Sequence, residues 1–226
     1  MKILASAIFD QESPFDFLFQ KRINLELGKD LQANLPVDAL ILWGGEDISP
    51  SIYNQKSSWL YTNAKEEMSI RDKIEVDLAK EAIKLGIPII GICRGAQLMC
   101  ALSGGSVIQH VTNHCKWGQH DMLTNAGQTL PTNSIHHQMM NPFKIPNFEL
   151  LAWSKIKLST KYIGAEGRDI VEAYHPDFKE PEIVWFPDTK SLCIQGHPEF
   201  STAKLPFIKY CLDLTRRYIF NNASPN

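Results

Sequence analysis

The sequence carries no marked excess of charge of either sign and no long apolar run. Its 226 residues include 23 Lys and Arg against 25 Asp and Glu, which gives a formal net charge of −2. This balance gives no electrostatic basis for binding nucleic acid or an anionic membrane surface, and no apolar stretch approaches membrane-spanning length. We therefore expect no nucleic-acid or membrane partner, and a small-molecule or peptide-like substrate.

Cysteine is also scarce. The five cysteines are an odd number without the regular spacings of a disulfide framework. The apolar N-terminus, Met1 to Phe9, has a single charged residue and no cleavage-site pattern, and Asp10 follows it, so we interpret it as a β-strand. Together these absences predict a reducing compartment, the cytoplasm.

The remaining composition is typical of one large α/β domain, which we assign to residues 1–226. With 44% hydrophobic and 21% charged residues, the chain can bury a full core. Short apolar runs predict strands at 38–43, 87–90, 106–111 and 192–195, and an antiparallel meander between 148 and 186. Helical spacing predicts helices at 15–31, 65–85, 96–102 and 205–220. Strands alternating with helices imply parallel pairing through right-handed crossovers.

Cys93 lies where the strand at 87–90 passes into the helix at 96–102. Its neighbours Gly91 and Gly95 carry no Cβ atoms that would obstruct a sharp turn, so the thiol can project from a strained nucleophile elbow. The positive end of the helix dipole would favour the thiolate. We therefore predict a nucleophile at Cys93. The other cysteines are interpreted as small buried hydrophobic residues: Cys100, Cys115, Cys193 and Cys211.

A nucleophilic thiol needs a base and a group that orients this base. His197-Pro198-Glu199 follows the last predicted strand, which places both side chains at the same sheet edge as Cys93. Side chains two residues apart on an extended segment project to one side, so Glu199 can reach the imidazole nitrogen that faces away from sulfur. His197 would then accept the thiol proton and later protonate a leaving amine.

Two glycines, Gly44-Gly45, end the strand at 38–43 and should lie beside Cys93, because strand ends of this polarity share one edge. The backbone N–H groups of Gly45 and Arg94 are candidates for an oxyanion hole, since two converging amides fit a tetrahedral oxyanion. Further along, the segment from Asn133 to Gln138 concentrates polar groups between irregular segments. We interpret it as a substrate clamp.

A group of potential metal ligands also occurs in the middle of the chain: His110, His114, Cys115 and His120. Their spacing matches no structural zinc pattern, and the segment lacks the paired groups that close a tetrahedral site. The sequence therefore predicts no metal ion.

The stretch from Gly91 to Gln97, together with His197-Pro198-Glu199, resembles the class I (triad) glutamine amidotransferase superfamily. Gly44 to Pro50, Arg71-Asp72 and Asn133 to Gln138 resemble the γ-glutamyl hydrolase branch, peptidase family C26, which includes γ-glutamyl-γ-aminobutyrate hydrolases. The resemblance implies a flavodoxin-like fold, with a doubly wound, mostly parallel central sheet, helices on both faces and an added antiparallel region.

The resemblance also implies roles for individual residues. Cys93 corresponds to the nucleophile, His197 to the base and Glu199 to its partner. The amides of Gly45 and Arg94 correspond to the oxyanion hole. The pocket for the glutamyl group corresponds to Gln97, Ser134 and His136. The implied reaction needs no cofactor and cleaves a γ-glutamyl amide through a glutamyl thioester, which releases glutamate.

Three hypotheses about function follow. The first is a stand-alone hydrolase that acts on a γ-glutamyl amine or γ-glutamyl phosphoramidate, with a homodimer as one open assembly. The second is a glutaminase subunit that passes ammonia to a separate synthetase partner. A non-catalytic protein is disfavoured, because all three triad positions hold competent residues. Many relatives have an aromatic residue directly before the triad histidine, where this chain has Gly196, so we expect a different pocket for the leaving amine.

Overall fold

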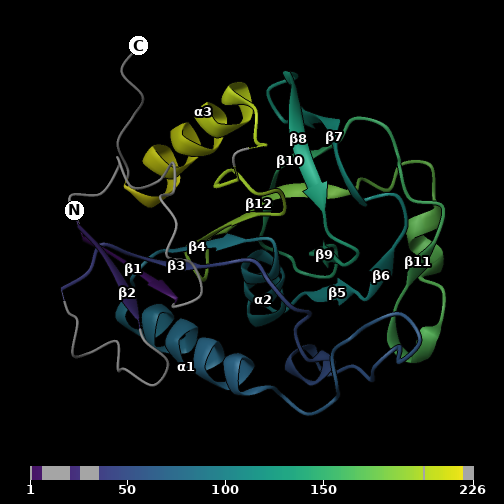
Figure 1. Ribbon diagram of the computed structural model, residues 1–226, viewed down its shortest axis with the longest axis horizontal. Helices are drawn as coiled ribbons and strands as arrows, with labels where there is room; N and C mark the ends of the chain where they lie inside the picture. Colours follow the sequence, from purple (N-terminus) through teal and green to yellow (C-terminus); the bar gives the residue numbers. More distant parts are fainter. Residues whose placement is uncertain (1, 7–20, 26–35, 201, 221–226) are drawn as a thin grey trace.

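The computed structural model describes residues 2–6, 21–25, 36–200 and 202–220, and a nine-stranded sheet forms its centre (Figure 1). The parallel half contains, in spatial order, β2 (Lys21–Leu25), β1 (Lys2–Ser6), β3 (Ala39–Leu42), β4 (Ile89–Ile92) and β13 (Ser191–Ile194). The antiparallel half continues with β12 (Pro181–Phe186), β10 (Glu149–Ser154), β7 (Cys115–Thr124) and β8 (Thr129–Ile135). The parallel order is that of a flavodoxin-like sheet, which confirms the predicted fold.

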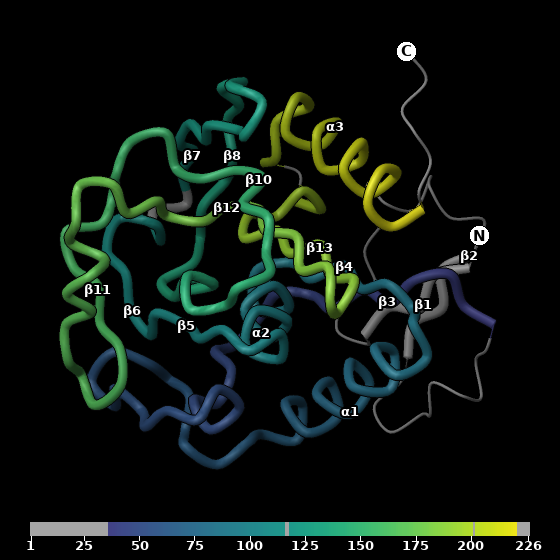
Figure 2. Tube along the Cα trace, turned by 180° about the vertical axis from the view of Figure 1, so that it is seen from behind, coloured from purple at the N-terminus to yellow at the C-terminus, as the bar shows by residue number. Residues whose placement is uncertain are grey.

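Helices cover both faces of the parallel half (Figures 1 and 2). Helices α1 (Ile70–Leu85) and α2 (Arg94–Leu102) lie on one face, and α3 (Leu205–Leu214) lies on the other. The side chains of β3 alternate between the two cores. Leu40 and Leu42 pack on the side of α1 and α2, whereas Ala39 and Ile41 pack on the side of α3. Because both faces are buried, this strand is a continuous apolar run in the sequence.

The crossover helix α1 has clear local signals at both ends. The Ser69 side chain accepts a hydrogen bond from the Asp72 N–H, and the Asp72 side chain accepts one from the Ser69 N–H, which forms a capping box. At the other end Gly86 adopts a φ of 70°, a conformation that favours glycine. The helix therefore begins at Ile70 rather than at residue 65, and β3 and β4 pair in parallel as predicted.

Two predictions near the start and middle of the chain are corrected. The described part of the predicted helix at 15–31 is strand β2, and the rest of that prediction lies outside the described residues. The predicted strand at 106–111 is divided into β5 (Ser106–Ile108) and β6 (His110–Val111). These pair in two small sheets with β9 (Met139–Asn141) and β11 (Tyr162–Ile163). Strand formation here depends on partners distant in sequence, which local pattern does not encode.

The region between β6 and the last strand also differs in part. The polar segment from Asn133 begins inside β8, which forms a long antiparallel hairpin with β7 instead of an irregular loop. Strands β10 and β12 pair antiparallel as predicted, but Val171–Tyr174 forms a 3-10 helix. After α3 the chain continues as a π-helical segment, Thr215–Ile219. Among the described residues, no helix is long and apolar enough to cross a membrane.

Candidate active site

Cys93 occupies a strained turn between β4 and α2, with φ 47° and ψ −103°. A positive φ is unfavourable for a residue with a side chain, and such strain is concentrated at functional sites. The Cys93 N–H donates to the Ile194 carbonyl at 2.7 Å. A Cβ atom at Gly91 would lie 2.6 Å from the Gly95 carbonyl oxygen, and one at Gly95 would lie 2.1 Å from the Leu42 carbonyl oxygen. Both glycines are therefore required for the turn.

His197 lies beside Cys93 and is supported on its far side by Glu199. The His197 Nδ1 and Glu199 Oε1 atoms are 2.7 Å apart, and the ring stacks on Phe200 with a centroid separation of 4.3 Å. Burial lowers the pKa of His197, but the charge and hydrogen bond of the Cys93 sulfur, followed by Glu199, raise it to about 10. The arrangement therefore favours a protonated imidazole at His197.

Asn133 fixes the backbone of His197 from the neighbouring β-hairpin. Its Oδ1 accepts a hydrogen bond from the His197 N–H at 2.7 Å, and its Nδ2 donates to the His197 carbonyl at 2.8 Å. This pair of contacts was not predicted. The sequence marked Asn133 only as one of several polar residues, and no local signal identifies its partner.

The Gly44-Gly45 loop lies beside Cys93 and His197, as predicted. A Cβ atom at Gly44 would lie 2.6 Å from His197 Cε1 and 3.4 Å from Cys93 Cβ. Arg71 Nη2 donates to the carbonyls of Trp43, at 3.1 Å, and Gly44, at 3.0 Å. Because a trans peptide directs its N–H opposite to its carbonyl, the Gly45 N–H points away from Arg71.

The side chain of Arg94 is buried and joins the start of α2 to α1. Its guanidinium contacts Asp72 at 2.6 Å and forms a second, short ion pair with Glu75. Arg71 Nε donates to the other Glu75 oxygen at 3.1 Å. Two cations and two carboxylates therefore fix the Gly44-Gly45 loop and the elbow relative to the same helix.

A cavity of about 880 Å³ opens in front of the elbow. Its lining includes Gly45, Cys93, Arg94, Gln97 and His136, which are five of the predicted site residues. The structure therefore brings the elbow, the glycine loop and two of the three glutamyl-binding candidates, Gln97 and His136, to one cavity.

Ser134, another predicted substrate-binding residue, lines a different cavity of about 350 Å³. Its hydroxyl donates to the His114 carbonyl at 2.6 Å. Gln195 was not predicted as a site residue. Its Nε2 donates to Cys93 Sγ at 3.6 Å, and its Oε1 accepts a hydrogen bond from Gln97 Nε2 at 3.5 Å. A polar residue at the end of an otherwise apolar buried strand was the signal that could have identified it.

Gly196, directly before His197, is closely surrounded by other side chains. A Cβ atom at Gly196 would lie 2.6 Å from Thr132 Oγ1 and 2.9 Å from Phe207 Cζ. Phe207 of α3 therefore occupies the direction in which an aromatic residue before His197 would project.

Cys115 is exposed, so its interpretation as a buried hydrophobic residue was wrong, whereas Cys100, Cys193 and Cys211 are buried as predicted.

The chain also matches a known protein family. A family model described as Peptidase C26 matches residues 28–199, which is most of the chain. The chain belongs to the Peptidase C26 family. Membership implies a hydrolase-type enzyme of the glutamine amidotransferase-like group and confirms the resemblance inferred from the elbow and His197-Pro198-Glu199.

Individual relatives of this Peptidase C26 protein are moderately similar. NtpR of Enterococcus hirae is 29% identical over 175 residues, which cover 73% of this chain and 68% of NtpR. A candidate glutamine amidotransferase-like protein of Lactococcus lactis subsp. lactis, YvdE, is 32% identical over 125 residues, which cover 46% of this chain. The aligned part spans 51% of YvdE, about half its length.

Solved structures support the fold of the family. A glutamine amidotransferase from Thermotoga maritima has a TM-score of 0.57 at 16% identity, with 97% of this chain and 84% of that chain covered. A candidate GMP synthase component from Thermoplasma acidophilum has a TM-score of 0.58 at 15% identity, with 98% and 91% covered. At these identities the likeness shows a shared fold.

Proposed function

We propose that this Peptidase C26 protein hydrolyses a γ-glutamyl amide bond, with Cys93 as nucleophile, His197 as acid and base, and Glu199 as the group that orients His197. The observation that carries the proposal is the strained Cys93 turn beside a histidine whose other nitrogen is 2.7 Å from a carboxylate. A nucleophile, its base and an orienting group in this sequence of contacts form a catalytic triad.

The Cys93 thiolate attacks the carbonyl carbon of the γ-glutamyl amide and forms a tetrahedral intermediate. The imidazolium of His197 then protonates the departing nitrogen, so the C–N bond breaks and an amine and a glutamyl thioester are formed. In the second half, His197 accepts a proton from water, which attacks the thioester. Glutamate is released, and the proton returns to the Cys93–His197 pair.

Two backbone amides are the candidate donors to the oxyanion. The Gly45 N–H points away from Arg71, and Gly45 and Arg94 both line the cavity in front of Cys93. The ion pairs of Arg94 with α1 hold its backbone in place before substrate binds, which is the preorganisation that such stabilisation requires. Gln97, which also lines this cavity, is the candidate contact of the glutamyl group.

The test is a mass-spectrometric screen of γ-glutamyl amines, γ-glutamyl phosphoramidates and glutamine for release of glutamate by the purified chain. Cys93→Ser should abolish turnover with the fold retained. For the substrate found, Glu199→Gln should lower kcat by a factor on the order of 10² to 10⁴, and His197→Ala by more. The matched control is Glu172→Gln, which changes an exposed carboxylate and should leave kcat unchanged.

A second candidate function is a glutaminase subunit that delivers ammonia to a synthetase. The fold likeness to the Thermoplasma acidophilum protein supports it, since that protein is described as a candidate component of GMP synthase. Ammonia release from glutamine that appears only when a second protein is added would favour this function. Turnover of a γ-glutamyl amine by the chain alone would favour the hydrolase, and no glutamate release under any condition would contradict both.

A further inference from the structure

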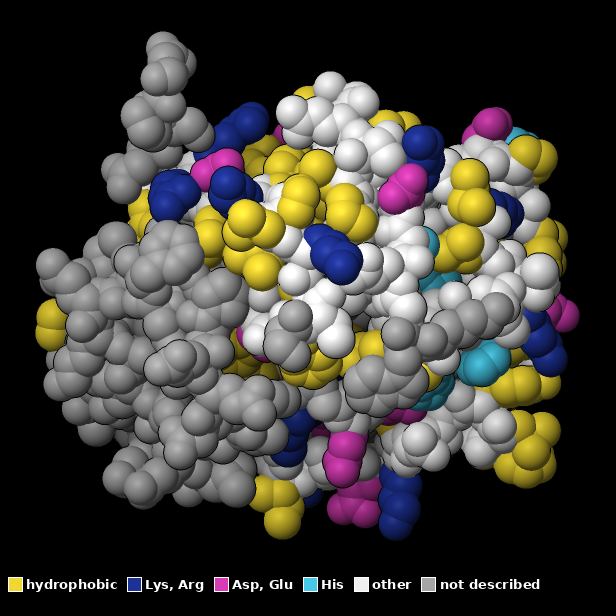
Figure 3. Space-filling model, turned by 45° about the horizontal axis from the view of Figure 1, so that its top comes forward, with side chains coloured by type: hydrophobic (Ala, Val, Ile, Leu, Met, Phe, Trp, Pro, Cys, Tyr) yellow, Lys and Arg dark blue, Asp and Glu magenta, His cyan; other side chains and the backbone are white. Residues whose placement is uncertain are grey.

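Histidines are concentrated in the part of the fold that joins the β7–β8 hairpin to β12. The ring of His114 lies 4.7 Å from that of His136 and 5.3 Å from that of His120, measured between centroids. Figure 3 shows that histidine side chains also gather in one region of the surface. Three residues from separate segments, His114, His136 and Glu182, place potential ligand atoms within 4.8 Å of one another, and all three are buried.

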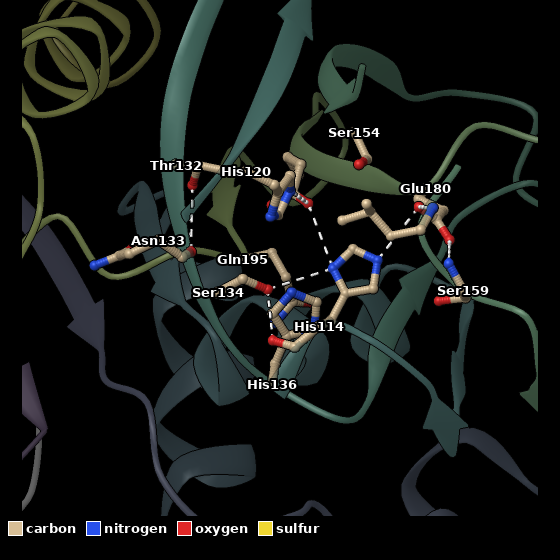
Figure 4. A network of polar contacts seen from close by, with 12 residues as sticks. His114, His120, Thr132, Asn133, Ser134, His136, Ser154, Ser159, Glu180 and Gln195 are labelled. Carbon is tan, nitrogen blue, oxygen red and sulfur yellow. Dashed lines mark hydrogen bonds and ion pairs between the residues drawn. The ribbon is translucent and has the colours of Figure 1, made fainter. Parts of the chain in front are cut away.

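The surroundings of His114 direct one of its ring nitrogens toward this group. Its Nε2 lies 3.3 Å from Glu180 (Figure 4), whereas its Nδ1 lies 3.9 Å from Glu182 Oε1. The Glu180 carboxylate accepts hydrogen bonds from two backbone N–H groups and from Tyr162. Its contact with His114 Nε2 lacks hydrogen-bond geometry among the described residues, but the negative charge beside Nε2 favours the ring proton on that nitrogen. Ser134 Oγ lies 3.4 Å from His114 Nδ1, but its single proton is donated to the His114 carbonyl at 2.6 Å, so with the ring proton on Nε2 the Nδ1 lone pair is open to a metal ion.

His136 is held in the corresponding way from the opposite side. Its Nδ1 lies 2.8 Å from the Gln138 carbonyl, which can only accept a hydrogen bond, so the ring proton resides on Nδ1. Its Nε2 then carries a lone pair, and within the described part of the chain this buried atom has no hydrogen-bond partner. An unpaired buried nitrogen is costly, and a metal ion would satisfy it.

Glu182 supplies the negative charge of the group. Its Oε1 is 2.8 Å from His120 Nε2, and its Oε2 is buried without a hydrogen-bond partner among the described residues. Two imidazoles and a carboxylate are a preferred ligand set for Zn²⁺, whose sites can keep a fourth position for water. The outer hydrogen bonds to Glu180, Gln138 and His120 are the supporting contacts that such ligands require.

We propose that His114 Nδ1, His136 Nε2 and Glu182 bind one Zn²⁺ ion. Ligand atoms about 2.1 Å from zinc at tetrahedral angles are about 3.4 Å apart. The three candidate atoms lie within 4.8 Å of one another, so the side chains would have to move closer together around the ion. Access exists on two sides, because His136 lines the large cavity, and His120 and Ser134 line the small one. The ion would link β12 to the end of β8. Strand β8 carries Asn133, which binds the backbone of His197.

The experiment measures Zn²⁺ binding to the full chain by competition with a fluorescent chelator, after metal has been stripped from the protein. It uses a Cys93→Ser background, which removes the thiolate that would compete for zinc. We expect one equivalent bound and a rise in Tm that saturates at one equivalent. His136→Gln and Glu182→Gln should each weaken binding by at least the ~10- to 100-fold typical of losing even a supporting partner.

The matched control is His175→Gln, which removes an exposed histidine and should leave zinc affinity unchanged. Co²⁺ substitution supplies a second readout that needs no ligand variant: the proposal predicts d–d bands of tetrahedral nitrogen and oxygen coordination without a thiolate charge-transfer band. No zinc uptake by the Cys93→Ser protein would overturn the proposal. It would also be overturned by uptake that neither ligand variant weakens, or by a thiolate band in the Co²⁺ spectrum. All these outcomes are independent of hydrolytic activity.

Discussion

Replacing Asn133 by alanine would test whether the β7–β8 hairpin positions the proposed base. Asn133 is buried, and its amide holds both backbone polar groups of His197, at 2.7 and 2.8 Å. It is not among the described residues that line the large cavity, and both ends of its amide bind the backbone of His197. The substitution therefore separates the positioning of His197 from binding of substrate.

The loss of unfolding free energy in Asn133→Ala depends on which hydrogen bonds the His197 backbone keeps. The His197 carbonyl keeps a second hydrogen bond from the Phe200 N–H at 3.3 Å, so it loses one of two partners. The His197 N–H loses the acceptor that Asn133 supplies, and a buried donor without a partner costs about 1–3 kcal/mol. Adding about 1 kcal/mol for the carbonyl contact, and allowing water to enter the vacated space, gives a loss of about 2–3 kcal/mol in the free energy of unfolding.

The assay combines urea denaturation with steady-state kinetics on the γ-glutamyl amide that the wild type hydrolyses. We expect kcat to fall about 10- to 100-fold with KM nearly unchanged, because a displaced base slows proton transfer without altering the pocket. The pH profile of Cys93 alkylation should shift as well. Asn147→Ala is the control, since it removes an exposed hydrogen bond to Asp188 and should change stability by less than about 0.5 kcal/mol. Wild-type kcat and stability in Asn133→Ala would refute the reasoning.

Three further predictions concern the elbow, the buried ion pairs and pH. Gly95→Ala should destabilise the fold by about 3 kcal/mol, because the new Cβ would lie 2.1 Å from the Leu42 carbonyl oxygen; unchanged urea denaturation would contradict this close packing. Arg94→Met should cost about 3–5 kcal/mol, because the buried Asp72 loses its cation and the buried Glu75 loses one of its two cations and keeps Arg71. The double variant with Arg94→Met and Glu75→Gln should recover part of this loss. A loss below about 1 kcal/mol in Arg94→Met alone would contradict the stabilising role of these ion pairs. Since the pKa of His197 rises from 6.5 to about 10 on folding, its protonation contributes fully below pH 6.5, and this contribution is lost as pH rises toward 10. The difference in unfolding free energy between wild type and His197→Gln should therefore shrink over that range, and a constant difference would count against the pairing.

Much of the fold was predictable because its signals are local. Two glycines around Cys93 predict a sharp turn, and an apolar β-branched run before it predicts a strand buried on both faces. The end of α1 is encoded by Gly86. Where pairing partners lie far away in the sequence, prediction failed: Lys21–Leu25 forms an edge strand, and the segment from Ser106 is divided between two small sheets.

The meeting of Cys93, the Gly44-Gly45 loop and His197 is encoded in the sequence. Each follows the end of a parallel strand, and strands of one polarity place those ends at one edge. What surrounds them depends on how the chain packs. Asn133 reaches His197 across 64 positions of sequence, and Phe207 fills the space beside Gly196. Likewise His114, His136 and Glu182 come from three segments and share no spacing that a motif could encode. Side chains that meet across antiparallel strands are set by register and packing, which are properties of the assembled sheet.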